Sequence, residues 1–120
     1  MAEVANMTGD RTGSAIDRRH LARMTFGDRS LEREVLELFD RQSAMLIARM
    51  REGQPAAIAS LAHTLKGSAA GIGAGAVARG ADAAEMAANA SPSDCSQAID
   101  RLAQAVDEAR ALIAELLKEH

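Results

Sequence analysis

The feature that most constrains this chain is the hydrophobic periodicity of its last segment, residues 91–118. Apolar side chains recur there every three or four positions, at Ile99, Leu102, Val106, Ala109, Ile113 and Leu116. This spacing is typical of one face of an α-helix. Ser91 can cap the helix, Pro92 suits its first turn, and Asp94 lies at the capping-box position. The sequence therefore predicts a helix about 40 Å long, at roughly 1.5 Å per residue.

Composition extends the helical prediction to the whole chain. Alanine, a strong helix former, supplies much of the 48% apolar content, and only Phe26 and Phe39 are aromatic. Residues that favour strands are too few to build a sheet. We expect an all-α fold, an antiparallel four-helix bundle with a short additional N-terminal helix. This domain would span 16–120 and follow a flexible tail at 1–15.

Helix ends and apolar faces can be placed along this domain. Asp17 and Asp28 can cap helices running to about 24 and 51, and Gly53 and Pro55 separate the second helix from a third at 55–73. A fourth helix is expected at 76–90. The residues expected to face the core are Ile16, Leu21 and Met24 in the first helix, Leu31, Val35, Leu38, Phe39, Leu46 and Met50 in the second, and Val77, Ala81, Ala84 and Ala88 in the fourth.

The helix expected at 55–73 carries one histidine, His63, opposite its apolar stripe. At about 100° per residue, Leu61, Leu65 and Ile72 point almost directly away from His63. The side chains on the histidine's own face are all small: Ala59, Ser60, Gly67, Ala70 and Gly71. Glycine inside a helix costs about 1 kcal/mol relative to alanine. We therefore expect that access to His63 matters more than local helix stability, and that something approaches the imidazole closely.

Charge and hydropathy argue against several classes of function. The net charge is −3 and basic residues are scattered, which argues against a nucleic-acid surface. No apolar run approaches the roughly 20 residues that span a bilayer, and the N-terminus lacks a signal pattern. We expect a cytoplasmic protein that binds neither nucleic acid nor membrane. Cys95 is the only cysteine, so no internal disulfide can form, and a redox role is a minor alternative. His20 and its neighbouring arginines could bind phosphate, although a solvated helix face is the simpler interpretation.

Other chemistries fit the His63 region less well. Residues 71–76 match a GxGxx(G/A) fingerprint, but no strand precedes them. His63 has no metal-ligating residue three or four positions later. Ser60 and Ser68 are candidate partners for a catalytic pair, but neither lies in a nucleophile elbow. A small hydrolase or transferase that uses His63 as a base is the alternative from another functional class, and it would need a pocket.

A nucleophilic histidine fits this face better. A free imidazole is largely neutral near pH 7 and offers a lone pair, and histidine forms covalent intermediates. If His63 took up a phosphoryl group, a nearby cation would stabilise the added charge. Lys66 lies one helical turn away. The small neighbouring side chains would then leave room for the active site of a partner protein.

The residues around His63 also follow a known pattern. His63, Leu65, Lys66, Gly67, Ser68, Ala69, Gly73 and Ala74 read as His-x-Leu-Lys-Gly-Ser-(Ser/Ala), with a glycine and an alanine ten and eleven residues after the histidine. This stretch resembles the histidine-containing phosphotransfer (HPt) domain of bacterial multistep phosphorelays. Gly27-Asp28, residues 36–39 and Ala84-Glu85 extend the resemblance to about 17–118. Gly71, where many members have a larger polar residue, and Ala84, in place of a common leucine, depart from it.

The resemblance implies a phosphocarrier. His63 would be the phosphoacceptor, through Nε2, Lys66 would support the phosphate, and Gly67 would clear space for the partner. Ala59, Ser60, Ala70 and Gly71 would be further docking residues. Phe39 would lie near the site, although a plain core position is the favoured interpretation, and Gly73 is expected to end its helix.

The same resemblance implies which partners and cofactors to expect. The partners would be receiver domains of a hybrid histidine kinase, a response regulator or both. The chain would need no cofactor, because magnesium is expected only in the receiver domain, and it would have no kinase domain or ATP site. We expect a monomer. The alternative within the same fold is a non-phosphorylated module that docks receiver or kinase domains.

Overall fold

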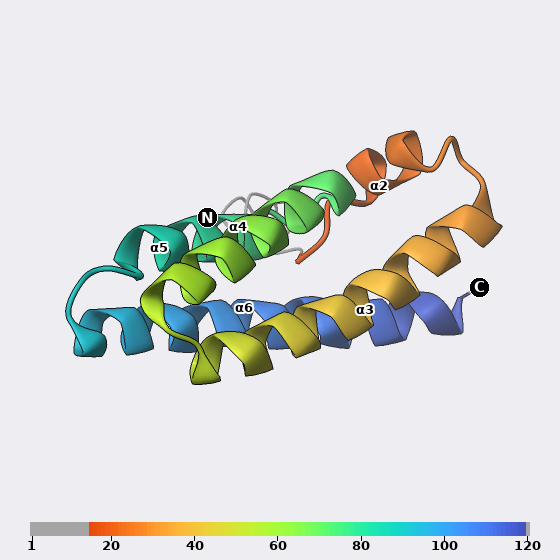
Figure 1. Ribbon diagram of the computed structural model, residues 1–120. Coiled ribbons are helices and arrows are strands. Elements are labelled where there is room, and N and C mark those ends of the chain that lie inside the picture. The colour runs from red at the N-terminus through yellow and green to blue at the C-terminus, as the bar shows by residue number, and fades with distance from the viewer. Residues whose placement is uncertain (1–14, 120) are drawn as a thin grey trace, which may run out of the picture.

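The computed structural model describes residues 15–119, which form five helices and no strand (Figure 1). The helices are α2 (Arg18–Met24), α3 (Arg29–Glu52), α4 (Pro55–Ile72), α5 (Gly75–Ala87) and α6 (Pro92–Lys118). The all-α prediction is confirmed. The tail predicted at 1–15 lies, apart from its last residue, outside the described residues.

Helices α3 to α6 form an antiparallel four-helix bundle. Connections of two to four residues join consecutive helices, so each helix runs back along its predecessor. In Figure 1, α4 lies between α3 and α5, and α6 closes the bundle against α5 and α3. The short α2 lies at the end of the bundle where α4 ends and α3 begins. This is the predicted architecture.

The helix starts follow the predicted capping residues. The Asp17 carboxylate accepts a hydrogen bond from the His20 backbone N–H, and Asp28 does the same for Leu31. The Ser91 hydroxyl accepts from the backbone N–H of Asp94 at 3.1 Å. These bonds satisfy backbone donors that have no partner within the helix. Side-chain capping therefore fixes where α2, α3 and α6 begin.

The part of the core next to α5 is built largely from small side chains. The four residues predicted to face inward from the fourth helix are buried, Val77, Ala81 and Ala84 within α5 and Ala88 at its C-cap. The six periodic residues of α6 are buried too. Gly80 on α5 lies so close to α6 that a Cβ there would be 3.3 Å from Leu102 Cδ1. Because alanine and glycine let helix backbones approach, α5 packs tightly between α4 and α6.

Two of the residues predicted to face the core do not do so. Leu38 is 60% exposed and Met24 is 51% exposed. Leu36 is fully buried in the core stripe of α3, and Leu38 lies roughly 200° further round the same helix. Leu31 and Val35 are only half-buried. The inner face of α3 is therefore narrower than its apolar content suggested.

Backbone contacts fasten α2 to the end of α4. The Asp17 N–H donates to the Gly73 carbonyl at 2.8 Å, and His20 Nε2 donates to the Gly71 carbonyl at 3.1 Å. His20 is half-buried, and its hydrogen bond to Gly71 joins α2 to α4. His20 is therefore not part of a fully solvated helix face. Gly73 has a left-handed backbone with φ of 81°. It ends α4, as the sequence predicted.

Replacing Gly73 tests this junction. Gly73→Ala is expected to lower the free energy of unfolding by about 1–2 kcal/mol, because L-residues disfavour left-handed backbone. The new Cβ would also lie only 3.0 Å from the Asp17 carbonyl oxygen. Gly71→Ala is the matched control, since a Cβ there meets nothing within 4 Å, and it is expected to stabilise α4 by up to about 1 kcal/mol. Urea denaturation followed by circular dichroism measures both. Equal changes in the free energy of unfolding for the two variants would contradict the special backbone requirement at Gly73.

Candidate functional site

His63 projects from the middle of α4 into solvent. Its side chain is 68% exposed. The opposite side of α4 carries five buried residues, Ile58, Ala62, Leu65, Ala69 and Ile72. Those side chains anchor α4 in the core, and the helical period then directs His63 outward. The orientation agrees with the angles read from the sequence.

The side chains around His63 leave its face open. Ser60, Gly67 and Ala70 are exposed, and Ala59 and Gly71 are half-buried. A Cβ added at Gly67 or at Gly71 would meet nothing within 4 Å. No packing among residues 15–119 therefore requires glycine at these two positions. The open space beside His63 is consistent with close approach by a partner.

Two acidic residues of α5, Asp82 and Glu85, complete the site, and no role was predicted for either of them from the sequence. His63 Nδ1 donates to Glu85 Oε2 at 3.1 Å. Lys66 Nζ lies 2.9 Å from Glu85 Oε1 and 3.1 Å from Asp82 Oδ1. The Glu85 carboxylate thus bridges His63 and Lys66, with one oxygen on each.

This arrangement sets which ring nitrogen of His63 can react. A carboxylate only accepts hydrogen bonds, so Nδ1 carries the proton that it donates to Glu85. In a neutral imidazole the other nitrogen, Nε2, then holds a lone pair. Within residues 15–119, no hydrogen bond occupies Nε2. The site therefore presents a nucleophile at Nε2 on an exposed face.

Ion pairing shifts the protonation of both charged partners. The close ion pair with Glu85, and then the hydrogen bond to Asp82, raise the pKa of Lys66 above its ordinary value of 10.5. The Lys66 ammonium lowers the pKa of Glu85 below its ordinary value of 4.5. Lys66 is thus a permanent cation one turn from His63, held by two carboxylates. Its role in supporting a phosphate stays a prediction.

The register of the α4–α5 hairpin could have identified the acidic pair. Ala74 is the second of the two residues that connect these helices. His63 lies 11 residues before Ala74 and Glu85 lies 11 after it. Lys66 and Asp82 lie 8 residues before and after. Antiparallel helices joined by so short a turn place such residues opposite each other.

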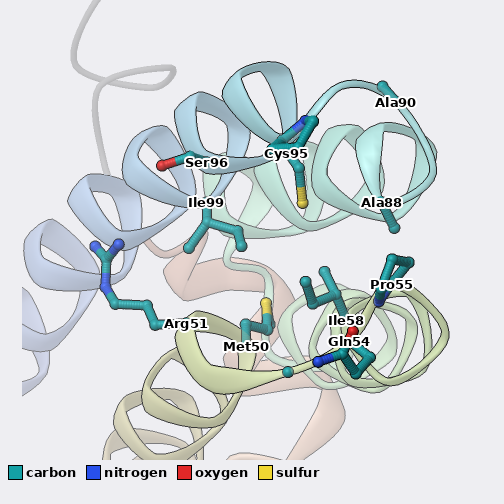
Figure 2. A pocket seen from close by; sticks show the side chains of 12 residues that line it. Met50, Arg51, Gln54, Pro55, Ile58, Ala88, Ala90, Cys95, Ser96 and Ile99 are labelled. Atoms are coloured by element: carbon teal, nitrogen blue, oxygen red, sulfur yellow. The ribbon is translucent and has the colours of Figure 1, made fainter.

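A separate apolar hollow lies at the end of the bundle away from α2. It has a volume of about 410 Å³ and sits between the α3–α4 and α5–α6 connections. Figure 2 shows the sulfur atoms of Cys95 and Met50 directed into it. Its lining includes none of His63, Ser60 and Ser68. This hollow therefore does not supply the pocket that a hydrolase built on His63 would need, and Cys95 is a buried residue that lines it.

Residues 15–119 contain no candidate metal site and no candidate membrane span. No three His, Cys, Asp or Glu side chains there lie close enough together to share a metal ion. None of the helices in this range combines the length and the apolar character needed to cross a bilayer.

The pKa shifts predict how the Lys66–Glu85 pair affects stability with pH. The lowered pKa means that Glu85 stabilises the fold above about pH 4.5, and that this contribution is lost as the pH falls through the folded-state pKa. The raised pKa means that Lys66 contributes below about pH 10.5 and loses its contribution as the pH rises further. Wild type should therefore melt at a higher temperature than Lys66→Met at neutral pH.

That difference should shrink in acid, where Glu85 becomes protonated. Lys118→Met is the matched control, because Lys118 pairs with Glu115 on an exposed surface, where ion pairs contribute little. Thermal unfolding from neutral to acidic pH measures the difference. A Lys66→Met effect that does not change with pH would contradict the pairing.

Comparison with known proteins identifies the family. No curated protein and no solved structure showed a significant match to this chain. Residues 34–112, about two thirds of the chain, match the family described as Hpt domain. The match contains α4 and α5 whole, with His63, Lys66 and the acidic residues opposite them. The exposed histidine, the helical bundle and this match lead to one conclusion: the chain belongs to the Hpt domain family.

Proposed function

We propose that this chain is a phosphorelay phosphocarrier whose acceptor is His63 Nε2. Hpt domains act in histidine phosphotransfer between receiver domains. The single observation that carries the specific proposal is the 3.1 Å hydrogen bond from His63 Nδ1 to Glu85, which leaves Nε2 with its lone pair on an exposed face. The proposed partners are receiver domains of a hybrid histidine kinase, a response regulator or both, in the cytoplasm.

The proposed transfer needs no proton movement on His63. The Nε2 lone pair attacks the phosphorus of an aspartyl phosphate in the receiver domain. The N–P bond forms as the bond between phosphorus and the aspartyl oxygen breaks, and the aspartate leaves as a carboxylate. The imidazole gains positive charge, which Glu85 stabilises through the Nδ1 proton. Delivery to a second receiver is the reverse of this step.

Lys66 is proposed to balance the charge of the phosphoryl group. Its ammonium is held by Glu85 and Asp82 one turn from His63. A phosphoryl group on Nε2 would compete with these carboxylates for the same cation. The flexible lysine stem allows that exchange without movement of α4. Lys66 would then be a switchable counter-ion, with its two carboxylates as the resting partners.

The proposal has a direct chemical test. Incubation with a phosphorylated receiver domain and magnesium should add one phosphoryl group to the chain, detected by intact mass at neutral or alkaline pH and lost in acid. His63→Gln should abolish the gain, because the nucleophile is removed, while the helical circular dichroism stays unchanged. A phosphorylated His63→Gln variant would refute the assignment. No gain from a panel of receiver domains would favour the non-phosphorylated docking module.

The open face is tested separately by adding bulk at Gly67. Gly67→Gln should slow phosphoryl transfer by about tenfold or more, because small displacements of reacting groups carry large rate penalties. The fold should be kept, since a Cβ at Gly67 points into open space. Ala114→Gln, on an exposed position of α6, is the matched control. Transfer at the wild-type rate by Gly67→Gln would contradict the access argument.

A further inference from the structure

Helices α4 and α5 bring one ammonium group and two carboxylates together beside the proposed phosphoacceptor. The permanently charged side chains of these two helices are Lys66, Arg79, Asp82 and Glu85. The guanidinium of Arg79 lies near Gly75, where an added Cβ would be 3.2 Å from Arg79 Nη1. Lys66 Nζ lies 3.1 Å from Asp82 Oδ1 and 2.9 Å from Glu85 Oε1. Two carboxylates therefore share the single ammonium of Lys66.

The two carboxylates differ in what they contact. Glu85 places one oxygen on His63 and the other on Lys66, and its side chain is 29% exposed. Among residues 15–119, the Asp82 carboxylate contacts only Lys66, and the side chain is 52% exposed. Orientation of the His63 ring therefore depends on Glu85, while the one contact of Asp82 at this site is with the cation.

A phosphoryl group on His63 would add a strong competitor for Lys66. Such a group carries close to two negative charges near pH 7. Asp82 already neutralises part of the lysine charge, and opposite charges a few ångströms apart attract each other even where water screens them. The Asp82 carboxylate therefore reduces the stabilisation that Lys66 can give to the phosphoryl group.

We propose that Asp82 is a positioning residue that acts through Lys66, by competing with the phosphoryl group for its ammonium, and that it thereby keeps the phosphoryl group of His63 easy to transfer. This inference rests on the proposed phosphocarrier function. The Lys66–Asp82 pair is stronger in the unphosphorylated chain than in the phosphorylated one, so it shifts the exchange equilibrium toward the phosphorylated receiver domain. Removing the Asp82 charge should make His63 hold its phosphoryl group more tightly.

The equilibrium of phosphoryl exchange with one receiver domain tests the proposal. The receiver is phosphorylated with acetyl phosphate and magnesium, separated from the donor and mixed with the full chain, and intact mass gives the phosphorylated fraction of both proteins. Asp82→Asn should shift the exchange constant about twofold to fivefold toward phosphorylated His63, the range expected for loss of an exposed ion pair. Asp100→Asn is the matched control, since it removes the exposed ion pair with Arg51 and should leave the constant unchanged.

Two further variants separate charge from structure. Asp82→Glu keeps the negative charge and should keep an exchange constant near the wild-type value. In a Lys66→Met background, Asp82→Asn should change the constant much less than it does in the wild-type background, because the shared cation is gone. An Asp82→Glu variant that behaves like Asp82→Asn overturns the charge argument. An equal shift in both backgrounds overturns the action through Lys66.

The same measurement distinguishes failure of this inference from failure of the proposed function. If wild type and Asp82→Asn are both phosphorylated on His63 with equal exchange constants, the role of Asp82 is wrong and the phosphocarrier proposal stands. If no receiver domain phosphorylates either chain, the phosphocarrier proposal is wrong and this inference falls with it.

Discussion

The carboxylate of Glu85 contacts both His63 and Lys66 of α4, and its position depends on how α4 pairs with α5. Alanines fill the interface between these helices, so the two backbones run close together. The left-handed backbone at Gly73 turns the chain within two residues, which sets the register. That register places His63 opposite Glu85 and Lys66 opposite Asp82. A change in the turn would therefore alter the chemistry of His63 without any change in α4 itself.

Helix α4 combines a buried inner face with an exposed outer face. Five buried side chains hold α4 against the bundle, while the outer face carries His63 among glycine, alanine and serine. Gly67 and Gly71 weaken the helix locally, and the fold tolerates this because packing of α4 against α3 and α5 supplies the missing stability. The buried side chains hold α4 in place, so the residues on its exposed face are not needed for packing and can contact a partner.

The sequence predicted the helices well because local signals decide them. Asp17, Asp28 and Ser91 act as caps, and the apolar stripe of α6 is buried at every predicted position. Predictions were less accurate for features that tertiary contacts determine, such as which side chains face the core. Leu38 was assigned to the core by periodicity alone, but α3 has two adjacent apolar stripes and only one of them faces inward. His20 is engaged by a carbonyl 51 residues away, which no local pattern reveals.

For the site, the sequence identified His63 and Lys66 but gave no role to Glu85 and Asp82, since their contacts depend on the register of a hairpin. We propose that Glu85 directs reaction to Nε2. Nuclear magnetic resonance of the phosphorylated chain, with labelled histidine nitrogen and phosphorus detection, tests this most directly. We predict coupling between phosphorus and His63 Nε2, with the proton on Nδ1. Phosphorus bonded to Nδ1, or to any residue other than His63, would contradict the account.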